Sequence, residues 1–196
     1  MAPKPRHMPD ADAVLRPAAA LLLIYPHEGL WHVPLTVRGS GLRQHTGQVS
    51  LPGGRLDHPG ESVEDAALRE AYEEIGVVPA EVELLGRLTP LPIAVSGHLL
   101  HPVIGVAAAR PPFALAADEV ERLIELPIAR LLEPDAIAWE QRVRQDAART
   151  FTVRGPETTV NVPYFAIAGA QVWGATAMVL AEFIALLEEI DFQVED

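Results

Sequence analysis

Residues 54–76 read GRLDHPGESVEDAALREAYEEIG, and the second half of this stretch concentrates carboxylates. Glu70, Glu73 and Glu74 stand at positions i, i+3 and i+4, so a helix here places all three on one face. Like charges at this spacing repel one another and destabilise a helix. Bound Mg²⁺ or Mn²⁺ would offset the repulsion, because both ions prefer carboxylate oxygens as ligands. A solvated acidic face is the alternative interpretation.

Local signals support the helix at both ends. Ser62 is a suitable N-cap, Asp65 completes an Asp-substituted capping box, and Gly76 suits the position after the last turn. Ala66 and Ala67 are predicted near the acidic side, where small side chains leave room for a bulky anion. The face that we expect to be buried consists of Leu68, Ala71, Tyr72 and Ile75.

The same stretch resembles the Nudix box. In that pattern a Gly is followed by five residues, a Glu, seven residues and then Arg-Glu-apolar-any-Glu-Glu-any-Gly-apolar. Here Glu61 is followed by seven residues and then by REAYEEIGV, with the small Ala71 at the first apolar position. Six residues instead of five separate Gly54 from Glu61. The extra residue falls in the loop at 56–60, where an insertion is easily tolerated.

A second motif precedes the box. Residues 35–54, LTVRGSGLRQHTGQVSLPGG, resemble the motif of the coenzyme A diphosphatase branch of the Nudix family. The Arg, Gly and Pro-Gly-Gly positions of that motif match, whereas Pro34, Gly39 and Leu51 replace its usual Leu, Ser and Phe. A one-residue insertion in the box is also familiar in that branch.

The resemblance implies an α/β fold, an α/β/α sandwich with a mixed sheet between helices. The predicted elements agree: strands at 19–25, 30–37, 49–51, 82–89, 102–109 and 120–126, a short helix near 129–132, and further strands at 138–144, 151–154 and 160–167. A closing helix at 172–190 is expected to bury Met178, Phe183, Ile184 and Leu187. We expect residues 1–17 to form a flexible proline-rich arm and residues 18–196 to form a single Nudix hydrolase domain.

The activity that the resemblance implies is Mg²⁺- or Mn²⁺-dependent hydrolysis of the diphosphate bond of coenzyme A or acyl-CoA. The products would be 3′,5′-ADP and 4′-phosphopantetheine or its acyl form. Glu70 and Glu74, one helical turn apart, are the first expected metal ligands. Glu73 is the third, through a second metal or a water. The Gly54 carbonyl would complete the set, because a turn without side chains lets the backbone approach an ion.

Further roles follow from the resemblance. Glu61 is expected to pair with Arg69 and to hold the loop against the helix, and an ordinary surface ion pair is the alternative. The catalytic candidates are Glu70, Glu73 and Glu119. The general base is expected to be Glu70 or Glu119, and Glu119 could instead bind an extra metal.

The substrate motif contributes cations and glycines. Arg38 and Arg43 flank its loop, and guanidinium groups bind phosphate bidentately. They are expected to hold either the diphosphate or the 3′-phosphate of coenzyme A, and Gly53 and Gly54 would also contact the substrate. Structural or loop roles are expected for His45, His98 and His101.

Composition narrows the class of protein. A net charge of −12 argues against a nucleic acid partner, since binding to the phosphate backbone relies on Lys and Arg. The absence of cysteine excludes disulfides, thiolate zinc sites and a Cys nucleophile. Without a membrane-length apolar run or a signal-peptide core at residues 1–17, we expect a cytoplasmic protein with no membrane partner and a small nucleotide substrate. Family members are often dimers, and the apolar C-terminal helix could serve either a homodimer interface or the core.

Two alternatives stay open. The Nudix box serves equally a hydrolase of ADP-ribose, NADH or another nucleotide, and only the motif at residues 35–54 favours coenzyme A. A non-catalytic binding module with the Nudix fold is the second alternative, which the intact acidic positions of the box oppose.

Overall fold

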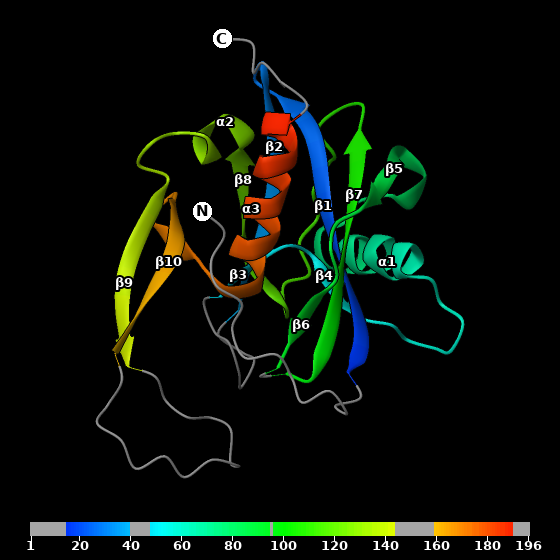
Figure 1. Ribbon diagram of the computed structural model, residues 1–196. Helices are drawn as coiled ribbons and strands as arrows, with labels where there is room; N and C mark the ends of the chain where they lie inside the picture. Colours follow the sequence, from blue (N-terminus) through cyan, green and yellow to red (C-terminus); the bar gives the residue numbers. More distant parts are fainter. Residues whose placement is uncertain (1–14, 40–47, 95, 144–158, 190–196) are drawn as a thin grey trace.

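The computed structural model describes residues 15–39, 48–94, 96–143 and 159–189, and its centre is strand β1 (Arg16–His27) (Figure 1). The apolar run of β1 is buried on both faces, as expected of a central strand. It pairs in parallel with β7 (His98–Ala107) and antiparallel with β2 (Leu30–Arg38). The strand begins at Arg16, so the last two residues of the predicted arm belong to the sheet.

The other strands extend this mixed sheet. The order is β3-β2-β1-β7-β5, with β4 on β1, β6 on β7 and β8 on β2. β6 is too short to be recognised from sequence, and β4 coincides with the predicted Gly-Gly turn. The bounds are β3 Val49–Ser50, β4 Gly53–Arg55, β5 Val82–Arg87, β6 Leu91–Ile93 and β8 Val120–Pro127.

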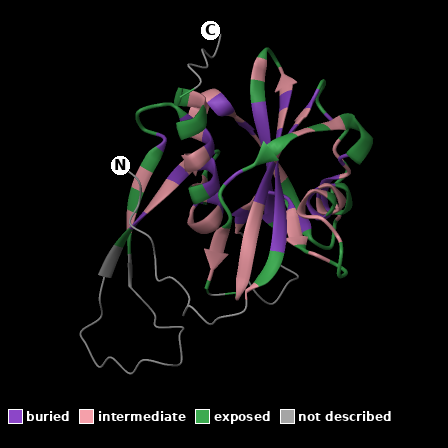
Figure 2. Cartoon of the chain, turned by 45° about the vertical axis from the view of Figure 1, so that its right-hand side comes forward, coloured by how far each residue is buried: buried purple, intermediate pink, exposed green. Residues whose placement is uncertain are grey.

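One long helix covers each face of the sheet, which confirms the predicted sandwich. Leu21 and Leu23 of β1 pack under α1 (Val63–Ile75), whereas Leu22 packs under α3 (Gly174–Glu189). All three leucines are fully buried, and Figure 2 shows the buried colour running along the middle of the sheet. The alternation of side chains along a strand thus divides the core into two layers.

The buried face of α1 agrees with the predicted one only at Ala71 and Ile75, which are both fully buried. Ala66 and Ala67 are fully buried against the sheet, whereas Tyr72 is 55% exposed and Leu68 only partly buried. The prediction that the two alanines border an open acidic face was therefore wrong. Small side chains let the helix axis approach β1 closely, and this close approach decides which face is covered. Ser62 and Gly76 cap the helix as predicted, the latter with φ of 75°.

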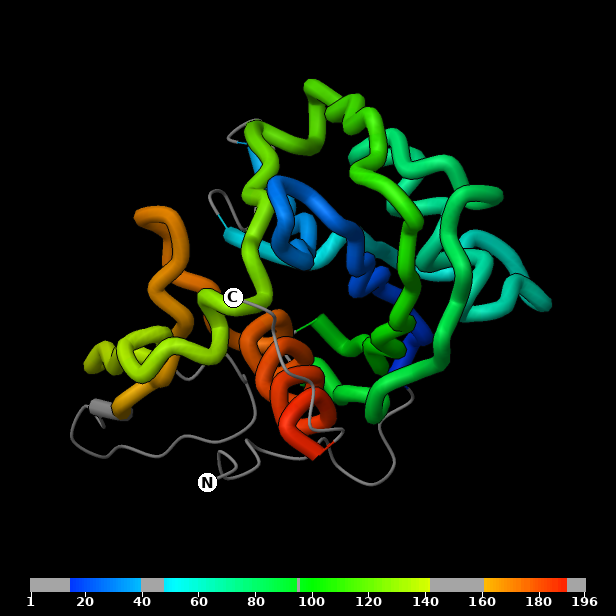
Figure 3. Tube along the Cα trace, turned by 90° about the horizontal axis from the view of Figure 1, so that it is seen from above, coloured from blue at the N-terminus to red at the C-terminus, as the bar shows by residue number. Residues whose placement is uncertain are grey.

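A smaller antiparallel sheet lies beside α3, on the opposite side of the molecule from α1 (Figure 3). Its strands are β9 (Ile137–Val143), β10 (Thr159–Ile167) and β11 (Ala170–Val172), the last of which the sequence did not predict. The strand predicted at 151–154 lies outside the described residues. In α3, Phe183 is buried as expected, but Met178 is 36% exposed.

Two short helices complete the described structure. They are η1 (Pro79–Glu81) and α2 (Ile128–Leu131). Among the described residues, no helix combines the length and apolar character needed to cross a membrane.

Candidate functional site

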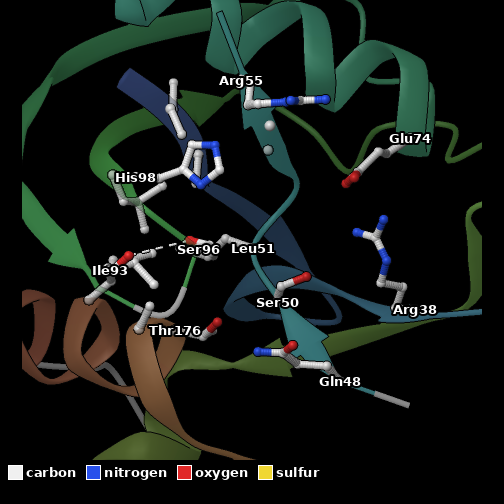
Figure 4. A pocket seen from close by; sticks show the side chains of 18 residues that line it. Arg38, Gln48, Ser50, Leu51, Arg55, Glu74, Ile93, Ser96, His98 and Thr176 are labelled. Atoms are coloured by element: carbon white, nitrogen blue, oxygen red, sulfur yellow. Dashed lines mark hydrogen bonds between the residues drawn. The ribbon is translucent and has the colours of Figure 1, made fainter. Parts of the chain in front are cut away.

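A cavity of about 300 Å³ opens between the end of β2, the β3–β4 segment, the start of β7 and the first turn of α3. Arg38 and Glu74 lie on one side of the β3–β4 segment, and Ser96 and His98 lie on the other (Figure 4). The cavity therefore joins the C-terminal end of α1, where the acidic motif ends, to the sheet face that carries α3.

The two glycines of β4 allow close approach of neighbouring groups. A Cβ on Gly53 would lie 2.3 Å from the Ala19 carbonyl oxygen, and a Cβ on Gly54 would lie 2.3 Å from Oε1 of Glu70. Any side chain at Gly54 would thus displace the Glu70 carboxylate. The Gly-Gly pair is consequently required both for pairing of β4 with β1 and for the position of an acidic side chain.

Glu74 is the least satisfied acidic group of the site. It is 8% exposed, and its Oε2 atom is buried with no hydrogen-bond partner. Burial raises its pKa to about 7, and the nearby Glu70 and Glu119 charges add to the rise. A hydrogen bond from the Gly53 backbone N–H and the charge of Arg38 act in the opposite direction. The residue is buried because Ala67, Ala71 and Glu74 share the sheet-facing side of α1.

The other two carboxylates of the motif contact Arg69. Its Nη1 atom lies 2.9 Å from Oε1 of Glu70 and 3.1 Å from Oε2 of Glu73. The Glu73 side chain is 54% exposed, whereas burial of Glu70 raises the pKa of that residue. Within the described residues, no three His, Asp or Glu side chains gather in a group that could hold a metal ion. The structure thus brings Glu70 and Glu74 near each other and leaves Glu73 at the surface.

Arg69 also joins the loop to the helix. Its Nε donates to Oε1 of Glu61 at 2.9 Å, and its Nη2 donates to the Arg55 carbonyl at 2.9 Å. The backbone N–H of Asp57 donates to Oε2 of Glu61 at 2.6 Å. The hydrogen bond from Arg69 lowers the pKa of Glu61. The Glu61–Arg69 pair predicted from the box is therefore present, and it connects α1 to β4.

The donor atoms at this corner fit a divalent cation. Oε2 of Glu74 lacks a hydrogen-bond partner, and the Glu70 carboxylate lies directly against Gly54. Carboxylate and backbone carbonyl groups both offer oxygen, the ligand atom that Mg²⁺ prefers. Glu74, Glu70 and the Gly54 carbonyl could hold such an ion. Glu73 fits less well, because its side chain is 54% exposed, whereas that of Glu70 is 16% exposed.

The remaining predicted residues border the cavity or lie outside the described part. Arg38 lines the cavity, and the neighbouring Gly39 N–H donates to the Glu119 carbonyl at 3.0 Å. This bond joins the end of β2 to the loop before β8 and brings the exposed Glu119 near Glu74. Arg43 and His45 lie outside the described residues.

Residues absent from the predicted site also line the cavity. Arg55 and His98 are the clearest, and Nε2 of His98 is buried without a hydrogen-bond partner. Burial and the charges of Arg16 and Arg55 lower the pKa of His98. Sequence offered one weak signal, the position of Arg55 directly after the Gly-Gly pair. Nothing local in the sequence indicated that His98 would lie beside it.

The raised pKa of Glu74 predicts a pH-dependent stability. In EDTA, the free energy of unfolding of wild type relative to Glu74→Gln should fall by up to about 3 kcal/mol as pH rises from 4.5 to 7. The folded state holds the proton more tightly than the unfolded state, so its advantage is complete below pH 4.5 and is lost as pH rises through about 7. Urea unfolding of both proteins at several pH values measures this. A constant difference across the range would contradict the buried carboxylate.

Comparison with known proteins agrees with the fold and the motifs. A family model described as NUDIX domain matches residues 14–147. The Nudix hydrolases NudL of Escherichia coli O7:K1 and Shigella boydii serotype 4 are 42% and 43% identical to the chain over 119 residues. Each match covers 60% of this chain and 60% of the relative, so the chain spans less than two thirds of their length.

Solved structures show the same architecture. RenU, a Nudix hydrolase from M. smegmatis, is 26% identical with a TM-score of 0.52, over 60% of this chain and 73% of its own. A MutT/nudix family protein from Enterococcus faecalis also gives 0.52, at 16% identity over 96% of this chain and 68% of its own, and shares the fold. With a family model spanning more than half of its residues, this chain belongs to the Nudix domain family.

Proposed function

We propose that this protein is a Mg²⁺- or Mn²⁺-dependent hydrolase of the diphosphate bond of coenzyme A or acyl-CoA. The observation that carries the proposal is the buried, unpartnered Oε2 of Glu74, which lies in a cavity beside Glu70 and the Gly53–Gly54 strand. A binding module has no need for an unsatisfied buried carboxylate, whereas a metal-dependent hydrolase does. The resemblance of residues 35–54 to the coenzyme A diphosphatase motif supports the substrate.

The roles proposed for the residues follow from their positions. Glu74, Glu70 and the Gly54 carbonyl would hold the metal, with Glu73 contributing through a water or a second ion. A bound metal would neutralise diphosphate charge and lower the pKa of water. The Glu61–Arg69 pair positions the metal-binding residues, because Arg69 contacts both the Glu70 carboxylate and the Arg55 carbonyl.

Residues of the chain would bind the diphosphate and accept the proton of the attacking water. Water attacks one phosphorus, the bond from that phosphorus to the bridging oxygen breaks, and the second phosphate leaves with that oxygen. Arg38, beside Glu74, would bind the diphosphate oxygens, and Arg43 is proposed as its companion. Glu119 or Glu70 would accept the proton of the attacking water. Glu119 suits this role because it is exposed and near Glu74.

Hydrolysis of coenzyme A tests the proposal directly. We expect 3′,5′-ADP and 4′-phosphopantetheine to accumulate with Mg²⁺ or Mn²⁺ and no product to form in EDTA. Comparison of kcat/KM among coenzyme A, ADP-ribose, NADH and nucleoside triphosphates then identifies the preferred substrate. Preference for another diphosphate would overturn the assignment of coenzyme A as substrate but not the proposed metal-dependent hydrolysis. Lack of turnover of every compound, with no metal bound at millimolar Mg²⁺, would favour a binding module.

A further inference from the structure

A basic cluster lies on one face of three adjacent strands. In the parallel register of β1 and β7, Arg16 is opposite His98. In the antiparallel register of β1 and β4, Ala18 is opposite Arg55. Residues two apart on a strand share a face, so Arg16, Ala18, Arg55 and His98 point to the same side. Ala18, Arg55 and His98 all line the cavity, whereas Arg16 lies outside its lining, two residues before Ala18 in β1.

The charges of this cluster are not balanced by carboxylates. Within the described part of the chain, neither Arg16 nor Arg55 forms an ion pair, whereas four other arginines pair with Glu or Asp: Arg69, Arg87, Arg110 and Arg130. The chain carries a net charge of −12, so acidic groups are abundant elsewhere. An unpaired surface arginine alone would mean little. The buried, unpartnered Nε2 of His98 is the second observation, and it points to a ligand that supplies an acceptor or donor.

This basic cluster is separate from Arg38, the arginine whose charge lowers the pKa of Glu74. Arg38 is the cation whose charge acts on the Glu74 carboxylate, whereas Arg16 and Arg55 act on His98. Figure 4 shows His98 and Glu74 on opposite sides of the β3–β4 segment. Leu51 and Leu100 contribute apolar wall to the same cavity. Among the described residues, the cavity is therefore lined by one carboxylate, that of Glu74, and by two members of the basic cluster, Arg55 and His98.

We propose that Arg55, His98 and Arg16 form a second anion subsite, which binds a phosphate monoester of the substrate separate from the diphosphate. Guanidinium groups bind phosphate oxygens through charge-assisted hydrogen bonds, and a neutral imidazole can donate one more. The assignment rests on the proposed function, under which the bound group is the 3′-phosphate of coenzyme A. It leaves Arg38 to the diphosphate.

Coenzyme A and 3′-dephospho-coenzyme A differ only in this phosphate and therefore isolate the subsite. Calorimetric titration in EDTA measures their binding without turnover. We expect wild type to bind coenzyme A about tenfold more tightly than the dephospho form, and Arg55→Ala to remove this preference. Arg16→Ala, at an exposed position where folding is not at risk, should reduce it.

Two matched variants control for charge. Arg38→Ala should weaken binding of both compounds by similar factors and keep the preference. Arg130 lies on α2 and forms surface ion pairs with Glu133 and Asp135. Arg130→Ala should leave the affinities for both compounds unchanged.

Equal affinities in wild type, no detectable binding of coenzyme A, or a preference that survives in both Arg55→Ala and Arg16→Ala would overturn the subsite. The proposed function fails separately: a retained binding preference with no metal-dependent hydrolysis would leave the subsite standing without the activity. If both compounds were hydrolysed with equal kcat/KM and bound with equal affinity, the diphosphatase activity would stand and the subsite would be contradicted.

Discussion

Glu74→Gln is expected to lower kcat for diphosphate hydrolysis by about 100-fold or more. The substitution keeps the shape of the side chain and removes the charge of the one acidic group whose oxygen is buried without a partner in the cavity. A neutral amide binds a divalent cation more weakly than a carboxylate does, so the metal that would neutralise the diphosphate would be held poorly. Steady-state kinetics with saturating Mg²⁺ measure the loss.

The stability of the same variant separates a chemical defect from a folding defect. Because the pKa of Glu74 is raised to about 7, the variant should be at least as stable as wild type at pH 8 in EDTA. Glu73→Gln is the matched control, since that carboxylate is exposed and bound to Arg69, and its effect on kcat should be smaller. Wild-type turnover in Glu74→Gln would contradict the assignment of Glu74 as a metal ligand.

Leu21→Ala is expected to lower the free energy of unfolding by about 2–5 kcal/mol. Leu21 is fully buried in the central strand, in the layer of core that lies under α1. β1 is paired with β7 on one side and with β4 and β2 on the other, so neighbouring atoms could not easily move into the cavity that truncation leaves. Urea or guanidinium unfolding of the two proteins gives the difference.

Leu68→Ala provides the comparison within the same layer. Leu68 is only partly buried, so its truncation removes less apolar contact and should be less destabilising than Leu21→Ala. Equal losses would mean that α1 covers the sheet with the face predicted from sequence, and not with the alanine face. The pair of variants therefore tests the orientation of the helix as well as the size of the core.

Local signals in the sequence were enough to locate the two long helices and most of the longer strands, but not the short strands β4, β6 and β11. The cap residues Ser62 and Gly76 mark the ends of α1, because their effects depend only on neighbouring backbone groups. The apolar run at 19–25 likewise predicted a strand, and only the sheet pairing shows that this strand is the central one. Strand bounds were less certain, since ladder hydrogen bonds with distant strands decide where a strand begins, as at Arg16 opposite His98.

The orientation of α1 could not be predicted from its apolar residues. A stripe through Tyr72 is as apolar as one through the alanines, and spacing along the helix does not distinguish them. The distance between helix and sheet decides, because only the alanine face lets α1 approach β1 closely. That choice also buries Glu74 and leaves Glu73 in contact with solvent and Arg69.

By itself, the sequence determined the family motif, the acidic helix with its caps, and the Glu61–Arg69 pair, because each depends on residues close together along the chain. Only the tertiary structure decided which carboxylate is buried and which basic residues lie near one another. Arg16, Arg55 and His98 are far apart in the chain and meet through the registers of β1 with β4 and β7. Register is set by the pairing of whole strands, so no local pattern in the sequence could reveal that cluster.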